Sequence, residues 1–202
     1  STPRTPEPTY VMSESMDWMQ FEDMVGARTS FNCGATGQVV RTTYSQQPVA
    51  MKIYRRKCST CKNSQCEACR EYNRDNWSLE VDMHNQLCDS YESSGGYAAF
   101  GAFPFAPLIK SVYVTHNGSV YFANLFHPGH MDMRYLMDKN KNMSAVNALL
   151  LAYDLCRIVS TLHRMGYAHS DVKPENVVVI ERAAPAAVDR KNLHRVHTQR
   201  RR

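Results

Sequence analysis

The stretch from Gly166 to Ile180, GYAHSDVKPENVVVI, constrains the fold of this chain more than any other part. It follows a predicted helix and ends in a run of valines, which predicts a buried strand. Charged side chains between a buried helix and a buried strand cost free energy unless they have partners or a chemical role. Asp171, Lys173 and Asn176 bring a carboxylate, a cation and an amide into six residues. These groups suit phosphoryl transfer, which needs a proton acceptor for a hydroxyl, a cation for the phosphoryl group and an oxygen ligand for a divalent metal ion.

The first two thirds of the chain predict strands around one helix. Gly34 and Gly37 mark a turn, and β-branched or alternating apolar residues flank it at 39–40 and 49–53. Residues 72–87 predict a helix because Trp77, Val81, His84 and, just after the range, Cys88 recur at helical spacing. Residues 108–126 predict a hairpin, with an Asn-Gly dipeptide at its turn.

A long helix is predicted from Ser144 to Met165. Ser144 suits the N-cap, and Gly166 suits the position after the last turn. The apolar stripe recurs at helical spacing and consists of Leu151, Leu155, Ile158, Leu162 and Met165. The order of strands, helix, strands and helix indicates an α+β fold rather than regularly alternating βαβ units.

Composition narrows the class of protein. The chain has 202 residues, of which 43% are apolar and 21% charged, as is typical of a soluble globular protein. No apolar run approaches the ~20 residues that span a bilayer, and the N-terminus lacks the pattern of a secretory signal. We therefore expect an intracellular protein, cytoplasmic or nuclear, without a membrane partner. The net charge of +5 is modest and lies largely in a basic tail at 189–202, so a nucleic-acid partner is not expected.

The segment from His169 to Asn176 resembles the catalytic loop of the eukaryotic-type protein kinase family. The signature there is His-Arg-Asp-hydrophobic-Lys-x-x-Asn, followed by apolar residues. The resemblance implies that Asp171, Lys173 and Asn176 are catalytic and that Asn176 also holds Mg²⁺. Lys173 favours serine/threonine over tyrosine specificity.

Two upstream motifs also resemble this family. VAMK resembles the strand motif Val-Ala-Ile-Lys, whose lysine grips the α- and β-phosphates of ATP. NCGATGQV resembles the Gly-rich loop, with Asn32 in place of the first glycine; Asn also accepts positive φ. The lysine follows the valine of the loop by thirteen residues, which strengthens both matches. The implied ATP-binding residues here are Asn32, Gly34, Gly37, Val39, Ala50 and Lys52.

The predicted helix at 72–87 supplies a partner for Lys52. EVDMHNQL resembles the family's helix C, so Glu80 is implied to pair with Lys52 at the ATP site. Glu71 is the alternative, although its neighbours are all polar. By the same resemblance, Asn124–Phe126 lies near the adenine-contacting hinge.

The resemblance has two departures. Ser170 stands where the family has the Arg that holds a phosphorylated activation loop, so regulation by that route is not expected. Asp189 stands at the position of the second Mg²⁺ ligand, but Arg190 and Lys191 follow it instead of Phe-Gly, and no Ala-Pro-Glu appears. Three explanations stay open: a fragment of a working kinase, a degenerate pseudokinase-like relic, or a chain completed by another chain.

These motifs predict three regions. They are a disordered leader (1–23), a protein-kinase-like domain (24–188) and the basic tail (189–202); the domain divides into an N-lobe (about 24–126) and a partial C-lobe (about 127–188). The implied function is a serine/threonine kinase that transfers the γ-phosphoryl group of ATP to a protein hydroxyl. The alternative is a catalytically inactive nucleotide-binding or scaffold protein. The implied partners are a protein with Ser or Thr and a chaperone or complementing chain.

A cysteine-rich insert, residues 58–69, lies between the motifs of Lys52 and Glu80. Its C-x2-C-x4-C-x2-C pattern is a zinc signature with an unusually short spacer, and the kinase family has no metal there. Zinc, free thiols and disulfides remain as alternatives, and a zinc-containing nucleic-acid binder is a third functional hypothesis. The four cysteines are Cys58, Cys61, Cys66 and Cys69.

Overall fold

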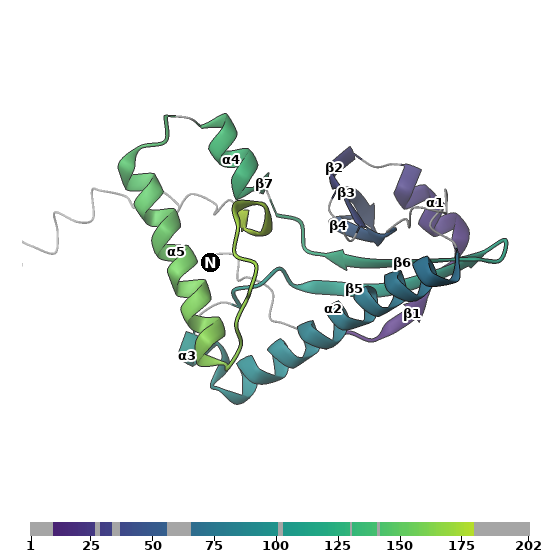
Figure 1. The fold of residues 1–202 in the computed structure, drawn as a ribbon, viewed down its shortest axis with the longest axis horizontal. Coiled ribbons are helices and arrows are strands. Elements are labelled where there is room, and N and C mark those ends of the chain that lie inside the picture. The colour runs from purple at the N-terminus through teal and green to yellow at the C-terminus, as the bar shows by residue number, and fades with distance from the viewer. Residues whose placement is uncertain are drawn as a thin grey trace, which may run out of the picture.

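A six-stranded sheet forms the first part of the fold (Figure 1). The computed structural model describes residues 10–26, 29–33, 37–55, 66–100, 103–129, 131–140 and 142–179. The strand order is β1-β5-β6-β4-β3-β2, and every pair is antiparallel except β1 with β5. The predicted α+β class and its antiparallel strands are confirmed. The strands are β1 (Ser13–Ser15), β2 (Thr29–Cys33), β3 (Gly37–Tyr44), β4 (Gln47–Tyr54), β5 (Leu108–His116) and β6 (Ser119–Phe126).

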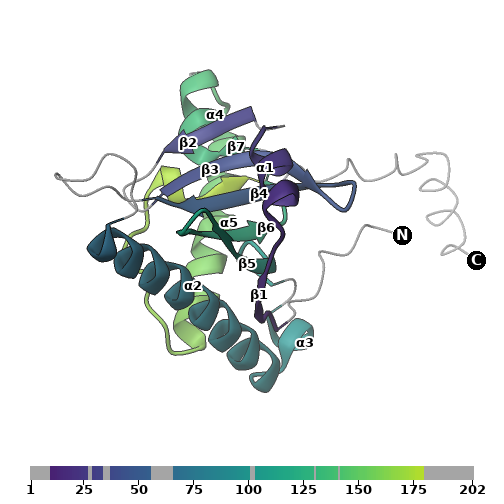
Figure 2. The same ribbon diagram turned by 90° about the vertical axis from the view of Figure 1, so that its right-hand side faces the viewer.

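The two faces of the sheet have different roles. Alternation along β4 sends Val49, Met51 and Ile53 into a buried core that includes Phe21 and Met24 of helix α1 (Trp18–Gly26). The residues between them, including Lys52, belong to the face along which helix α2 (Glu67–Ser93) runs. Figure 2 shows α2 passing along the sheet, away from α1.

Residues 10–26 belong to the fold, so the prediction of a disordered leader as far as residue 23 was wrong for this part. The side chain of Asn85 holds the backbone of Val11 by two hydrogen bonds: it accepts from the Val11 amide at 2.9 Å and donates to the Val11 carbonyl at 2.9 Å. Val11, Met16 and Phe21 are buried. Residues 1–9, which contain three prolines and three threonines, lie outside the described residues. The buried apolar side chains Met16 and Phe21 farther along pack into the core of the sheet.

Helix α2 is longer than the predicted range of 72–87. Buried side chains recur at helical spacing on both sides of that range, from Cys69 to Tyr91. The helix therefore stays amphipathic although the sequence around these residues is mostly polar. A short helix, α3 (Gly96–Phe100), follows it. The buried residues of α2 are Cys69, Asn73, Trp77, Val81, His84, Asn85, Cys88 and Tyr91.

The last part of the described chain carries two helices and a small two-stranded sheet. Asp132 caps α4 by accepting from the Tyr135 amide, and the predicted N-cap Ser144 accepts from the Asn147 amide at 3.2 Å. The long predicted helix is therefore confirmed. The elements are β7 (Met131–Asp132), α4 (Met133–Lys139), α5 (Ala145–Arg164), the 3-10 turn η1 (Pro174–Asn176) and β8 (Val178–Val179).

Helix α5 stands away from the sheet and presents an apolar face to solvent (Figure 1). Leu162 is buried on its inner side, whereas Leu149 and Tyr153 are 69% and 61% exposed. By length and composition alone, α5 is apolar enough to cross a membrane. A single such helix is weak support for a membrane span, and Asp154 and Arg157 near its middle would be costly in a bilayer.

Candidate active site

The structure brings together the lysine of β4 and a glutamate of α2. Lys52 Nζ lies 2.8 Å from Glu80 Oε1, across 28 residues of sequence. Both side chains are partly exposed, at 24% and 33%, so the ion pair lies at the edge of the packed interior. Glu71, the alternative partner, is exposed about two and a half turns earlier on the helix.

The residues predicted to contact ATP lie on strands next to Lys52. Val39 pairs directly with Lys52 in the sheet, and Asn32 pairs with Val39. A Cβ on Gly37 would lie 2.2 Å from the Ile53 carbonyl oxygen, so this position requires glycine. Ala50 lies on β4, and Gly34 falls outside the described residues.

Asn124–Phe126, near the predicted hinge, forms the end of β6, and its contact with adenine stays a prediction. Asn124 and Leu125 are fully buried within β6, and the strand continues to Phe126 before the chain leaves the sheet at His127. The Asn124 side chain donates to Glu80 Oε2 at 3.3 Å. A single Asn within the apolar run VYFANLF was the only sequence signal for this role.

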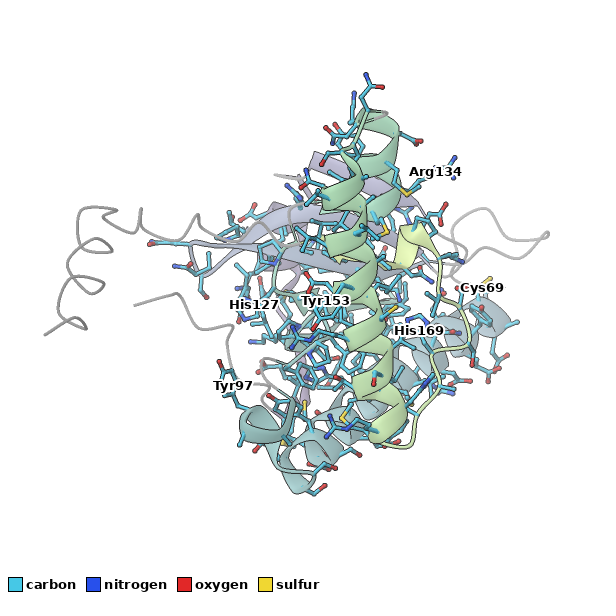
Figure 3. The ribbon with its side chains drawn as sticks, turned by 90° about the vertical axis from the view of Figure 1, so that its left-hand side faces the viewer. Cys69, Tyr97, His127, Arg134, Tyr153 and His169 are labelled. Carbon is cyan, nitrogen blue, oxygen red and sulfur yellow. The ribbon has the colours of Figure 1, made fainter. Side chains whose placement is uncertain are left out.

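The predicted catalytic loop forms a compact cluster after α5. Asp171 Oδ2 lies 2.8 Å from Lys173 Nζ, and Asn176 Nδ2 donates to the same oxygen at 2.8 Å. A further bond from Asn176 Nδ2 to the Asp171 carbonyl oxygen, at 2.9 Å, closes the loop on itself. Figure 3 labels His169, the first residue of this loop, beside α5.

A tight turn presents Asp171. Its amide donates to the His169 carbonyl oxygen at 2.8 Å, and Ser170 between them has a φ of 61°. A three-residue turn with positive φ at a non-glycine residue is strained and is typical of functional sites. The far end of the loop is fixed because Met133 N donates to the Val177 carbonyl oxygen at 2.8 Å and β7 pairs with β8.

The charges of the loop support one another although the side chains are exposed. The hydrogen bond from Lys173, followed by that from Asn176, lowers the pKa of Asp171 below its ordinary value. The hydrogen bond to Asp171 raises the pKa of Lys173 above its ordinary value. Asp171 therefore stays a carboxylate, and Lys173 a cation, over a wider pH range than isolated side chains would.

The chemistry of one loop residue fits Mg²⁺. Both hydrogen bonds of the Asn176 side chain use its nitrogen, which leaves the carbonyl oxygen for a hard cation that prefers oxygen ligands. Asp189, the predicted second ligand, lies outside the described residues.

The zinc prediction stays untested. Cys66 lies at the start of α2 and Cys69 is buried in its first turn (Figure 3), whereas Cys58 and Cys61 lie outside the described residues. No group of three or more metal-ligating side chains occurs in the part of the chain that the structure describes.

Comparisons with known proteins find protein kinases. No protein-family model matches the chain. A Wee1-like protein kinase of Oryza sativa subsp. japonica is 42% identical over 43 residues, which are 21% of this chain and 8% of that protein. A probable serine/threonine-protein kinase of Dictyostelium discoideum is 32% identical over 73 residues, which are 33% of this chain and 4% of that protein. The chain thus spans less than a tenth of the curated relatives that it matches. Among solved structures, vaccinia related kinase 3 is 15% identical with a TM-score of 0.48, over 76% of this chain and 42% of that one.

The loop electrostatics predict a pH effect. The Asp171 carboxylate should titrate below the usual Asp range, and Lys173→Met should raise its pKa, because the strongest hydrogen bond to the ionised form is lost. The contribution of the Asp171–Lys173 pair to the stability of the folded chain is fully present above the ordinary Asp pKa. It is lost as the pH falls through the lowered pKa of Asp171. A ¹³C NMR titration of the Asp171 carboxyl measures this pKa. Lys139→Met, a change on α4 where Lys139 lies over the Tyr135 ring, should leave it unchanged. An unshifted Asp171 pKa in Lys173→Met would contradict the assigned cause.

Proposed function

We propose that this protein-kinase-like chain binds ATP and transfers its γ-phosphoryl group to a serine or threonine hydroxyl of a protein. The observation that carries the proposal is the ion pair of Lys52 with Glu80. It joins a strand lysine to a helix carboxylate, which is the pairing that the sequence motifs imply. The full activity, its protein substrates and its place inside the cell are parts of this proposal.

The position of Lys52 supports a role as a phosphate ligand. A lysine side chain is a point charge on a flexible stem, so its position depends on what holds the amine. Glu80 contacts the Lys52 amine from the side of α2. An ammonium group has three donors, and its partial exposure leaves room for phosphate oxygens.

The loop residues supply the groups that act on the hydroxyl. Asp171 would hold the hydroxyl and take its proton as the new oxygen–phosphorus bond forms and the bond to the leaving ADP oxygen breaks. Lys173 would balance charge on the phosphoryl oxygens. Asn176 would hold Mg²⁺ through its side-chain carbonyl oxygen, and the bound ion would neutralise negative charge on the phosphates.

Substitution of Lys52 tests nucleotide binding. Lys52→Met should weaken Mg-ATP binding about 10- to 100-fold, because a hydrogen bond to a charged phosphate is lost. Lys110→Met is a matched control, since Lys110 is a sheet lysine of the same exposure, 24%, paired with Glu14. Isothermal titration calorimetry measures both affinities. Equal affinities for wild type and Lys52→Met, or an equal loss in the control, would exclude Lys52 as a phosphate ligand.

Substitution of Asp171 separates the kinase from the alternative, a nucleotide-binding protein without activity. Asp171→Asn should lower the rate of phosphoryl transfer to casein by about 10²–10⁴ while ATP affinity changes little, because the carboxylate acts in the transition state. Asp138→Asn, which alters an exposed acid paired with Arg134 on α4, should leave both quantities unchanged. Transfer that persists in Asp171→Asn would contradict the catalytic role. ATP binding by the wild type without any transfer would favour the inactive alternative.

A further inference from the structure

We propose that Asn124 is a positioning residue that orients the Glu80 carboxylate toward Lys52. This inference deepens the proposed function and takes its catalytic meaning from it. It rests on contacts that no motif in the sequence indicated.

The register of the sheet places four polar residues in one row across four strands. Ser13 of β1 pairs with Ser111 of β5, Ser111 pairs with Asn124 of β6, and Asn124 pairs with Lys52 of β4. Directly paired residues point to the same face of a sheet. The row therefore runs from the N-terminal strand to the proposed phosphate ligand on the face that α2 covers.

The side chain of Asn124 has a partner at both of its polar atoms. Its nitrogen donates to Tyr54 Oη at 2.9 Å and to Glu80 Oε2 at 3.3 Å, and its oxygen accepts from Ser111 Oγ at 2.8 Å. An amide nitrogen carries two hydrogens, and both are used here. Ser13 Oγ extends the row by donating to Ser111 Oγ at 3.3 Å.

Burial makes the hydrogen bonds of this cluster necessary. Asn124 and Ser111 are both 0% exposed, and a buried polar side chain is costly unless its hydrogen bonds are made within the protein, as they are here. An apolar residue at position 124 would suit Phe122, which lies two residues earlier on the same face of β6 and packs with Tyr54 and Trp77. The cluster thus replaces apolar packing at the place where it reaches Glu80.

The geometry at Glu80 shows what the cluster achieves. One oxygen of the carboxylate, Oε1, faces Lys52, and the other, Oε2, accepts from Asn124. A carboxylate held only by one partly exposed lysine keeps much of its rotational freedom. Such ion pairs contribute little to the free energy of folding. A second donor from a fixed strand removes that freedom and leaves Oε1 aimed at the lysine amine.

A double-mutant cycle in stability tests the contact without nucleotide. Asn124→Leu and Glu80→Met, made singly and together, should show a coupling of about tenfold in the unfolding equilibrium constant, measured in urea. Asn85→Leu with Glu80→Met is the control cycle, because Asn85 is also a buried amide but binds the Val11 backbone. That cycle should show no coupling. If Asn124→Leu does not fold, Asn124→Ser replaces it, since a serine hydroxyl is too short to reach Glu80.

The order of ATP affinities separates positioning from a merely structural role. Asn124→Asp keeps acceptors for the Tyr54 and Ser111 hydroxyls but sets a second carboxylate against Glu80. Positioning predicts that Asn124→Asp weakens Mg-ATP binding more than Asn124→Leu does. A structural role predicts the reverse order. Positioning also predicts that adding Asn124→Leu to Lys52→Met causes no further loss of affinity.

The role of Asn124 and the proposed function can be disproved separately. Absence of coupling between Asn124 and Glu80, or the reverse order of affinities, overturns the role of Asn124. A wild-type chain that does not bind Mg-ATP overturns the proposed function, and the stability cycle then still decides whether Asn124 holds Glu80.

Discussion

The ion pair between Lys52 and Glu80 is the contact on which the proposed site depends, yet it cannot hold the structure together by itself. A partly exposed ion pair contributes about 0–1 kcal/mol, whereas burying one large apolar side chain contributes about 1.5–3 kcal/mol. Trp77 packs against Tyr54 and Phe122, and Val81 packs against Val11 and Leu108. These contacts lie on either side of Glu80 along α2. Apolar packing therefore sets the place of the helix, and polar contacts set the direction of the carboxylate.

A small two-stranded sheet holds the other part of the proposed site, the loop with Asp171, Lys173 and Asn176. The small β7–β8 sheet fixes the end of the proposed catalytic loop, and Gly129 lies so close to this sheet that an added Cβ would meet Val178 at 1.8 Å. Arg41 of β3 donates to the Gly129 carbonyl oxygen at 2.6 Å. The strand layer thus contacts the segment that leads into β7, the partner of β8. The loop itself depends on short-range bonds among Asp171, Lys173 and Asn176.

Local patterns in the sequence predicted part of this structure, and long-range contacts decided the rest. The pairing of Lys52 with Glu80 followed from two motifs that each fit within a strand or a helix. The cap at Ser144 followed from the residue type alone. Strand β1 was missed because its three residues, SES, carry no apolar alternation and are ordered by pairing with β5. The contacts of the Asn124 side chain could not be predicted, because its partners come from three elements that meet only in the folded chain.

Chemical protection of Lys52 tests the central claim most directly, that the Lys52–Glu80 pair is a nucleotide site. Acetic anhydride acetylates exposed amines, and mass spectrometry gives the rate at each lysine of the wild-type chain. At an Mg-ATP concentration of ten times Kd, acetylation of Lys52 should slow about tenfold, because the occupied fraction is protected. Acetylation of Lys110, which has the same exposure, should not change. An equal rate at Lys52 with and without Mg-ATP would contradict the account.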